Sequence, residues 1–500
     1  MSLVRSVSRC ATMGLVAAAA CAYDARVSPE PAAARAPQFA AVAPGRAANN
    51  RHIVSFSGSA PTDFAAQVAA LGGKVLWVSP GSGLAAVSGL QGSAAATLAG
   101  KRGIQAVDAD ALLSLDMPRL ATEATAEAGG VQSNAAPATA VRYPRQWNMR
   151  AVQADVAWAH GFLGSSSVSV FMLDSGIDPH HSDTQGRVDA TRSVDLLGTF
   201  DAVLQDGTTV PFTEADTVQK YFPGAEVYTD LFFHGTHTGA TVSSNAVRAA
   251  GVTSMTTLVA VKVCGYINDC PFSSILNGVF YAADNGADVI NMSLGGAFTK
   301  AGNGRFVGLL NKTFNYARSK GVTIVVSAGN AATDLDHNGN TYQTFCDTPA
   351  VICVAATGPT SDANATTRNG PWTNVDAPAY YTNFGRSAIN VAAPGGNSSF
   401  GPPLAAPAGR DVFVWAACSQ TSLIIGCFSS PNFIVGAQGT SMAAPHVAGT
   451  AALLVSILGR NPGQIKARIQ QSADNVAGNG TTPFYGKGRL NVARAVGAIP

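Results

Sequence analysis

Charged side chains are scarce in this sequence. Its 500 residues include 32 lysines and arginines and 30 aspartates and glutamates, so only 12% of the chain is charged and the formal net charge is +2. Such a chain carries no strong field of one sign that would attract nucleic acid or an acidic membrane surface. We therefore expect neither of these among its partners.

Long hydrophobic runs are also missing beyond the N-terminus. Although 47% of the residues are hydrophobic, no stretch after residue 21 reaches the length of a membrane-spanning helix without charges or turn residues. The 52 glycines and 26 prolines predict many tight turns instead. The length allows about three domains and a large core, and the composition is typical of a globular protein.

The first 21 residues have the pattern of a signal peptide. Arg5 and Arg9 precede an apolar run over residues 10–20, which is too short to cross a bilayer. Small residues stand directly before Cys21, a pattern that allows either ordinary cleavage or lipid attachment at Cys21. We predict a secreted protein, with lipid anchoring at the cell surface or outer membrane as the alternative.

A linker and a small domain are expected next. Residues 22–50 are rich in Ala, Pro and Arg and lack periodicity, which predicts a linker and also disfavours a buried N-terminal helix over the first 21 residues. Residues 51–116 show strand and helix patterns in the order β-α-β-β-α-β, which predicts a ferredoxin-like α+β domain without a catalytic constellation. Residues 117–146 again lack apolar periodicity, so we expect an exposed linker there.

The remaining residues, 147–500, alternate short apolar runs with helical stretches. This alternation predicts an α/β domain with a doubly wound parallel sheet and helices on both faces. In such sheets, chemistry is expected at the carboxyl ends of the strands. The predicted strands cover residues 168–173, 258–263, 289–292, 322–326 and 351–355, and the predicted helices cover 151–160, 274–285, 305–319 and 442–458.

One serine stands between a tight turn and an apolar helix. Ser441 belongs to the stretch 439–449, which reads Gly-Thr-Ser-Met-Ala-Ala-Pro-His-Val-Ala-Gly, and the uncharged residues 442–458 predict a buried helix. The unpaired N–H groups and the dipole at the start of that helix would favour an anion forming beside the Ser441 oxygen. Taken alone, the same pattern could be a simple helix N-cap.

Two further polar stretches follow a predicted strand or open a predicted helix. Asp174, in Asp-Ser-Gly-Ile-Asp, comes directly after a buried strand, where an acid can also be a mere turn former. His234 opens the stretch His-Gly-Thr-His-Thr-Gly. His234 and His237 could share a helix face with Asp230 nearby, so a metal site is an alternative for these residues.

Asp174, His234 and Ser441 are the three groups that acyl transfer needs. A hydroxyl nucleophile requires an imidazole that takes its proton and a buried carboxylate that sets the imidazole tautomer. Asn330 ends a buried strand in Gly-Asn, where its amide could donate to a developing oxyanion or merely form a turn. This combination favours nucleophilic catalysis over metal binding.

These motifs resemble those of the subtilisin-like serine proteases, or subtilases. The order Asp, His, Ser and the sequence blocks around the three residues match the family's pattern. The resemblance implies Asp174 as the carboxylate, His234 as the base and Ser441 as the nucleophile. It also implies an oxyanion hole formed by Asn330 and the backbone N–H of Ser441.

The resemblance also implies how substrate and propeptide bind. In this family a small N-terminal domain assists folding and inhibits the enzyme by laying its last strand in the substrate cleft. Residues 51–116 would therefore be the inhibitory propeptide, 117–146 an activation linker and 147–500 the catalytic domain. A monomer that acts on protein or peptide substrates is implied as well. The implied substrate-binding residues are Ser293, Leu294, Gly295, Ala328 and Gly329.

Some segments depart from the family's pattern. Residues 196–230 and 397–436 contain apparent insertions whose role cannot be read from the sequence. The segment after the histidine stretch lacks the asparagine-rich loop that binds calcium in many subtilases, although Asp183 resembles one calcium ligand. We expect no cofactor in the chemistry, and structural calcium stays open without assigned ligands.

The six cysteines beyond Cys10 and Cys21 fall in three close pairs. Six cysteines allow fifteen connectivities, and reduced thiols are the alternative, but proximity in the sequence favours three local disulfides. The spacings do not fit zinc clusters. Disulfides agree with export. The predicted bridges are Cys264–Cys270, Cys346–Cys353 and Cys418–Cys427.

These features predict a secreted serine endopeptidase with an Asp/His/Ser triad and an acyl-enzyme intermediate, made as a self-processing zymogen. The alternative from another class is a surface protein that keeps the fold for binding alone. Such a protein would be expected to have lost members of the triad, and none is missing. Activity on a single dedicated protein is a second alternative, which the insertions favour.

Overall fold

A computed structural model describes most of the chain after the N-terminal region. The described residues are 47–113, 115, 123–126, 129–203, 209–267, 269–301, 304–343, 345–362, 370–398, 412–425, 427 and 430–500. The predicted signal peptide, with Cys21, and nearly all of the predicted linker 22–50 lie outside these residues, so both stay predictions.

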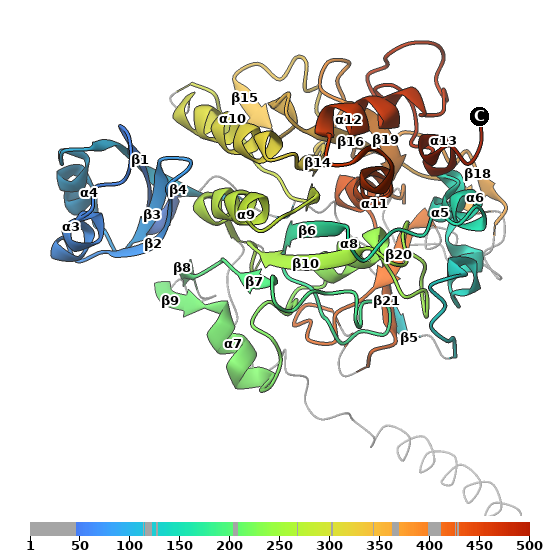
Figure 1. Cartoon of the computed structure of the whole chain (residues 1–500), viewed down its shortest axis with the longest axis horizontal. Coiled ribbons are helices and arrows are strands. Elements are labelled where there is room, and N and C mark those ends of the chain that lie inside the picture. Colours follow the sequence, from blue (N-terminus) through green and yellow to red (C-terminus); the bar gives the residue numbers. More distant parts are fainter. Residues whose placement is uncertain are drawn as a thin grey trace, which may run out of the picture. The chain divides into compact units, whose positions relative to one another are not determined.

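The small N-terminal domain is an antiparallel sheet with two helices (Figure 1). The sheet order β4-β1-β3-β2 and the element order β-α-β-β-α-β confirm the predicted ferredoxin-like arrangement. Its core joins Phe64, Val68 and Leu98 of the helices to Val54 and Val87 of the sheet. The elements are β1 (Ala47–Phe56), α3 (Phe64–Ala70), β2 (Lys74–Ser79), β3 (Leu84–Ser88), α4 (Gly92–Ala99) and β4 (Ile104–Leu113).

The large domain is built on a parallel sheet of seven strands, as the sequence predicted. Its order is β19-β16-β14-β12-β6-β10-β7, and every paired neighbour runs parallel. All residues of β6, an interior strand next to the middle strand β12, are buried because helices cover both faces of the sheet. The strands are β6 (Ser169–Asp174), β7 (Val194–Asp195), β10 (Thr257–Lys262), β12 (Val289–Met292), β14 (Thr323–Ser327), β16 (Ile352–Thr357) and β19 (Val391–Pro394).

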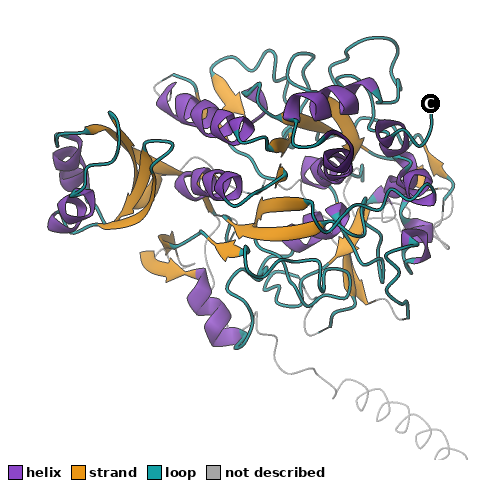
Figure 2. Cartoon of the chain, viewed as in Figure 1, coloured by secondary structure: helices purple, strands orange, loops and turns teal. Residues whose placement is uncertain are grey.

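Helices pack on the two faces of this sheet (Figure 2). On one face, α8 and α11 share a core with Val170 and Met172 of β6. On the other face, α9 lies so close that a Cβ on Gly278 would come within 3.1 Å of Leu173. The helices are α8 (His234–Val242), α9 (Phe272–Asp284), α10 (Gly304–Ser319), α11 (Thr440–Leu458), α12 (Pro462–Gln471) and α13 (Val492–Val496).

Helix α11 is the buried helix predicted after Ser441. It is long and apolar enough to cross a membrane, but 83% of its most apolar window is buried inside the protein. It is therefore a core helix. The helix predicted over 151–160 is shorter, because Gln153 has a left-handed backbone (φ 56°) between α5 (Trp147–Ala151) and α6 (Ala154–Ala159).

Within the predicted linker 117–146, residues 129–132 are exposed as expected, whereas other described parts of it pack against the large domain. Strand β5 (Glu123–Ala126) pairs with β21 (Phe433–Ala437), which in turn pairs with β20 (Val414–Ala417). Gln146 is buried and its Nε2 donates to the carbonyl oxygens of Ala250 at 3.0 Å and Trp415 at 3.1 Å. The partners are distant in sequence, so local periodicity gave no sign of this packing.

The insertion 196–230 forms ordered structure beside the sheet. Strands β8 (Thr199–Val203) and β9 (Thr209–Thr213) pair antiparallel, and α7 (Glu214–Tyr221) follows directly. The N-terminal residue of α7, Glu214, is buried although its type is among those most often exposed. This insertion therefore reaches into the protein interior.

Candidate active site

Asp174 is the last residue of β6, at the carboxyl edge of the sheet. Its carboxylate is fully buried and accepts hydrogen bonds from the N–H of Ser175 at 2.8 Å and from Oγ1 of Thr238 at 3.1 Å. Gly176 continues the turn at φ 107°, where a Cβ would lie only 2.4 Å from the carbonyl oxygen of Tyr228. The turn therefore requires glycine, and it holds the carboxylate in one orientation.

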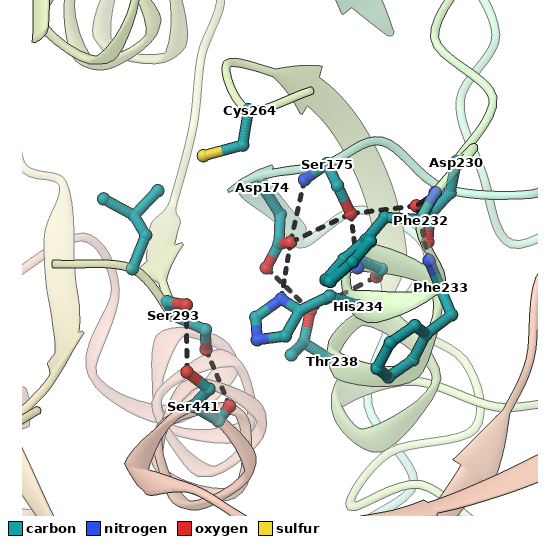
Figure 3. Close-up of polar contacts among 12 residues, drawn as sticks. Asp174, Ser175, Asp230, Phe232, Phe233, His234, Thr238, Cys264, Ser293 and Ser441 are labelled. Atoms are coloured by element: carbon teal, nitrogen blue, oxygen red, sulfur yellow. Dashed lines mark hydrogen bonds and ion pairs between the residues drawn. The ribbon is translucent and has the colours of Figure 1, made fainter. Parts of the chain in front are cut away.

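His234 is the first residue of α8 and is fully buried. Its Nδ1 lies 2.7 Å from Oδ1 of Asp174, a contact drawn as a dashed line in Figure 3. A carboxylate accepts only, so Nδ1 carries a proton and Nε2 of the neutral ring is left as the basic nitrogen. Among the described residues Nε2 has no hydrogen-bond partner. The ring is thus in the tautomer that a general base needs.

Ser441 lies in the first turn of α11, on the side of His234 opposite to Asp174 (Figure 3). Its hydroxyl donates to the carbonyl oxygen of Ser293 at 3.1 Å, and Oγ of Ser293 donates to the carbonyl oxygen of Ser441 at 2.8 Å. The structure therefore shows the serine hydroxyl turned toward Ser293. Rotation about its Cα–Cβ bond would redirect the oxygen without moving the helix.

Asn330 lies just after β14, next to the start of α11. Its Oδ1 accepts hydrogen bonds from the N–H of Thr440 at 2.8 Å and from Oγ1 of Thr440 at 2.9 Å. These contacts set the orientation of the amide, whose Nδ2 is the donor end. The structure thus brings Asn330 beside Ser441, as an oxyanion hole would need.

The predicted substrate-binding residues lie at the ends of β12 and β14. Ser293, Leu294 and Ala328 are buried, and Oγ of Ser327 contacts the carbonyl oxygen of Leu294 at 3.5 Å. The two segments that hold Ser293–Gly295 and Ala328–Gly329 are therefore neighbours beside Ser441.

The end of β4 pairs with a short strand that directly precedes α9. Leu113 and Leu112 lie opposite Cys270 and Pro271 in an antiparallel pair with β11 (Cys270–Pro271). A Cβ on Gly296 would lie 2.6 Å from Cδ2 of Leu113, so the leucine packs directly on the segment that follows Gly295. Leu112 and Leu113 are both buried in this contact.

Sequence comparison decides which family has this arrangement. A model of the subtilase family matches residues 165–488, more than half of the chain. The chain belongs to the subtilase family. It is accordingly a subtilisin-like hydrolase, a serine endopeptidase.

Known subtilases resemble the chain over most of its length. Thermitase from Thermoactinomyces vulgaris is 29% identical over 355 residues, which cover 70% of this chain and 96% of thermitase. A thermophilic serine proteinase from Bacillus sp. (strain AK1) is 30% identical over 355 residues, which cover 70% of this chain and 67% of that protein.

Solved structures share the fold. The epidermin leader peptide processing serine protease from Staphylococcus aureus matches with a TM-score of 0.65 and 19% identity, over 89% of this chain and 97% of that one. Fervidolysin from Fervidobacterium pennivorans matches with a TM-score of 0.60 and 20% identity, over 92% of this chain and 64% of that one. Both matches extend beyond the family model to the small domain.

Asp230 is the residue of this subtilase site whose role the sequence did not reveal. Its carboxylate accepts from the N–H groups of Phe232 and Phe233, both at 3.0 Å, and from Oγ of Ser175 at 2.9 Å. It also accepts from N and Oγ1 of Thr236 at 2.8 and 2.7 Å. Burial raises the pKa of Asp230 to about 6, and these hydrogen bonds oppose the rise.

The same contacts disfavour the metal site considered at His234, His237 and Asp230. His234 bonds to Asp174, Asp230 is surrounded by donors, and Nε2 of His237 bonds to the carbonyl oxygen of Val414 at 3.0 Å. Burial lowers the pKa of His237 to about 3, so it is a neutral core histidine. Within the described ranges, no group of three His, Cys, Asp or Glu side chains is arranged to hold a metal.

Asp183 does not fit the role of a calcium ligand. Its Oδ1 accepts from the N–H groups of Val247 at 2.9 Å and Arg248 at 2.8 Å, and its Oδ2 accepts from the N–H of Ala249 at 3.0 Å. A calcium ligand needs its oxygen lone pairs directed at the cation, whereas here three N–H donors point at them. In this subtilase the carboxylate organises the loop after α8 directly.

Three disulfides join the cysteine pairs predicted from their proximity: Cys264–Cys270, Cys346–Cys353 and Cys418–Cys427. The first lies beside the active site (Figure 3), because the N–H of Cys264 reaches the carbonyl oxygen of Asp174 at 3.2 Å. Its other half, Cys270, belongs to the strand that pairs with Leu113. The second lies beside the end of β14, since Sγ of Cys346 lies 3.6 Å from the carbonyl oxygen of Ser327.

Proposed function

We propose that this subtilase is an exported endopeptidase, made as a self-processing zymogen, in which Asp174, His234 and Ser441 form the catalytic triad. The observation that carries the proposal is the buried 2.7 Å contact between Oδ1 of Asp174 and Nδ1 of His234, with Ser441 on the far side of the ring.

The chemistry follows from this geometry. Nε2 of His234 takes the hydroxyl proton of Ser441 as its oxygen attacks the carbonyl carbon of the scissile bond. The oxyanion is stabilised by the N–H of Ser441, at the positive end of α11, and by Nδ2 of Asn330. The imidazolium, stabilised by Asp174, then protonates the leaving amine. Water repeats the sequence to hydrolyse the acyl-enzyme, and no cofactor enters these steps.

Residues 51–116 act in this proposal as the inhibitory propeptide. The pairing of Leu112–Leu113 with Cys270–Pro271 is strand addition at the cleft edge, a position that a substrate backbone would otherwise take. A second contact supports it, since Oδ1 of Asp110 accepts from the N–H of Ser273 in the first turn of α9 at 2.9 Å. Substrates are proteins or peptides, and the propeptide is an intramolecular partner.

Export is supported by the signal-peptide pattern and by the three disulfides. Ordinary cleavage of the signal peptide would give a secreted enzyme, whereas lipid attachment at Cys21 would give an anchored one. Mass analysis of the exported N-terminus separates the two.

A time course of the purified precursor tests the proposal, with wild type beside Ser441→Ala. Wild type should shorten to a fragment that begins between residues 116 and 147 and should then hydrolyse casein, and a serine-directed covalent inhibitor should block both. Ser441→Ala should remain full length. A Ser441→Ala precursor that shortens at the wild-type rate would rule out self-processing, and casein hydrolysis by that variant would rule out the triad.

A further inference from the structure

A buried ion pair joins the sheet, near Asp174, to the insertion 196–230. Nζ of Lys262 lies 2.6 Å from Oε1 of Glu214, and both side chains are fully buried. Lys262 is the last residue of β10 and stands opposite Asp174 in the parallel register of β10 and β6. Glu214 is the first residue of α7 in the insertion.

The ammonium group of Lys262 has a further partner near the site. Its Nζ donates to the carbonyl oxygen of Thr229 at 2.7 Å, while Oε2 of Glu214 accepts from the N–H of Tyr266 at 2.9 Å. Burying two charges costs free energy that an isolated pair does not always regain. We therefore look for a role of this pair other than stability. The bond from Lys262 to Thr229 indicates which segment the pair holds in place.

Thr229 leads directly into the segment that orients His234. A Cβ on Gly176 would lie 2.9 Å from the carbonyl oxygen of Thr229, so this backbone packs against the turn that follows Asp174. The next residue, Asp230, accepts from Oγ of Ser175 at 2.9 Å, which ties the two segments together.

Asp230 in turn holds the start of α8. Its carboxylate binds the N–H groups of Phe232 and Phe233, the two residues that precede His234. Phe233 has φ 150°, a backbone region that side-chain-bearing residues rarely adopt. Such a conformation persists only where surrounding contacts impose it, and Asp230 supplies those contacts.

We propose that Glu214 and Lys262 are positioning residues for His234: the pair holds Thr229, and through it Asp230 and the start of α8, in the place that catalysis needs. The insertion 196–230, which supplies Glu214, would then be a required support of the active site. This inference rests on the proposed role of His234 as the catalytic base.

Paired variants separate positioning from stability. Lys262→Met removes the ammonium and leaves Glu214 buried without its partner. The double variant Glu214→Gln/Lys262→Met removes both charges at similar volume and retains an acceptor for the N–H of Tyr266. Because neutral replacement of both partners is often harmless to stability, the double variant should keep a Tm near that of wild type. It still lacks the donor to Thr229.

The expected result is a loss of kcat in the single and the double variant alike. With the base displaced, kcat on a peptide substrate should fall about ten-fold or more, because even 1 Å of misplacement can cost about 10²-fold. KM should stay within about two-fold, since no substrate contact is removed. A double variant with wild-type kcat, or an effect on KM alone, would overturn the proposal.

Arg489→Met is the matched control. Arg489 is largely buried and pairs with Asp376 at 2.8 Å and with Asp474, both in the C-terminal half of the chain. Its loss should lower Tm without lowering kcat. An equal loss of kcat in this control would show that any broken internal ion pair has the same effect, and would overturn the specific role of Lys262.

A measurement that does not depend on catalysis distinguishes this inference from the proposed function. In the full-length Ser441→Ala protein, the Nδ1 proton of His234 bonded to Asp174 should give a low-field proton NMR signal. Lys262→Met and the double variant should shift or broaden this signal, whereas Arg489→Met should not. An unchanged signal in the double variant would overturn the positioning role. An inactive wild type would instead count against the proposed function.

Discussion

Asp174 and His234 form a 2.7 Å hydrogen bond although 60 positions separate them in the chain. Asp174 is the last residue of β6 and His234 is the first residue of α8, and both side chains are fully buried. In that environment the carboxylate decides which ring nitrogen carries the proton. In the proposed triad, this contact leaves Nε2 of His234 as the basic nitrogen.

Asp174→Asn should reduce kcat by about 10⁴-fold, the order of loss known for removal of the triad carboxylate in subtilisin. The amide is neutral and can donate to Nδ1, which would place the ring proton on Nε2 and remove the base. Steady-state kinetics with a peptide substrate measure the change. KM should vary little, and a variant with more than a tenth of wild-type kcat would contradict this role.

Asn330→Ala should lower kcat by about 10²–10³-fold, as removal of an oxyanion donor does in subtilisin. The amide acts only when charge develops on the substrate oxygen, so KM should be nearly unchanged. Thr440→Val is the control, because it removes the Oγ1 donor to Oδ1 of Asn330 at 2.9 Å but keeps the amide. A control as impaired as Asn330→Ala would indicate that orientation matters more than the donor.

Asp110→Asn should weaken the binding of the small domain to the catalytic domain. Asp110 is fully buried, pairs with Nε of Arg51 at 3.2 Å and accepts from Ser273 of α9. Loss of one partner of a buried pair costs about 3–5 kcal/mol, because the other charge stays buried. After self-cleavage, casein hydrolysis should therefore appear sooner than in wild type.

Asp108→Asn is the comparison for that experiment. Asp108 lies on the same strand, but its partner Arg305 is 3.6 Å away and 60% exposed. An exposed pair of this kind contributes about 0–1 kcal/mol. The lag between cleavage and activity should stay close to that of wild type, and an equal change in both variants would contradict the prediction for Asp110.

Stability should fall in acid as two buried histidines resist protonation. Burial lowers the pKa of His446 to about 4 and that of His237 to about 3, from 6.5 in the unfolded chain. Between pH 6.5 and these values the unfolded state binds protons that the folded state excludes, so the free energy of unfolding falls as pH falls. Each histidine contributes ~1.4 kcal/mol per pH unit in that window.

The variant His446→Gln isolates one of these contributions. In the Ser441→Ala precursor, it should show a smaller loss of Tm than the parent between pH 6.5 and 4.5. The raised pKa of Asp230, about 6, acts in the opposite direction between pH 3.8 and 6, but equally in both proteins. Parallel Tm curves would show that His446 is protonated in the folded state.

Asp183→Asn should destabilise the protein by the same amount with and without calcium. Replacing one carboxylate oxygen by an NH₂ group leaves the N–H of Ala249 or of Val247 and Arg248 facing a donor, a loss of about 1–3 kcal/mol. Thermal unfolding in EDTA and in calcium measures this difference. If calcium stabilised wild type but not Asp183→Asn, Asp183 would be a calcium ligand after all.

The disulfides and the sheet could be predicted because their signals are local. The strands predicted at 289–292 and 322–326 match β12 and β14 to within a residue, since a strand buried on both faces is a continuous apolar run. The cysteine pairs are separated by 6, 7 and 9 positions, so proximity alone indicated the bridges. The triad candidates were visible because each lies in a distinctive motif.

The sequence by itself indicated the family, the main strands and helices of both domains and the candidate catalytic residues, because each of these signals lies in side chains that are neighbours along the chain. Tertiary structure alone decided that Gln146 is buried, that Asp183 accepts hydrogen bonds from the loop after α8, and that Asp230 holds the start of that helix. It also decided the partner of Lys262. Those outcomes depend on which distant groups burial brings within hydrogen-bond reach, and no local pattern specifies a partner across the fold.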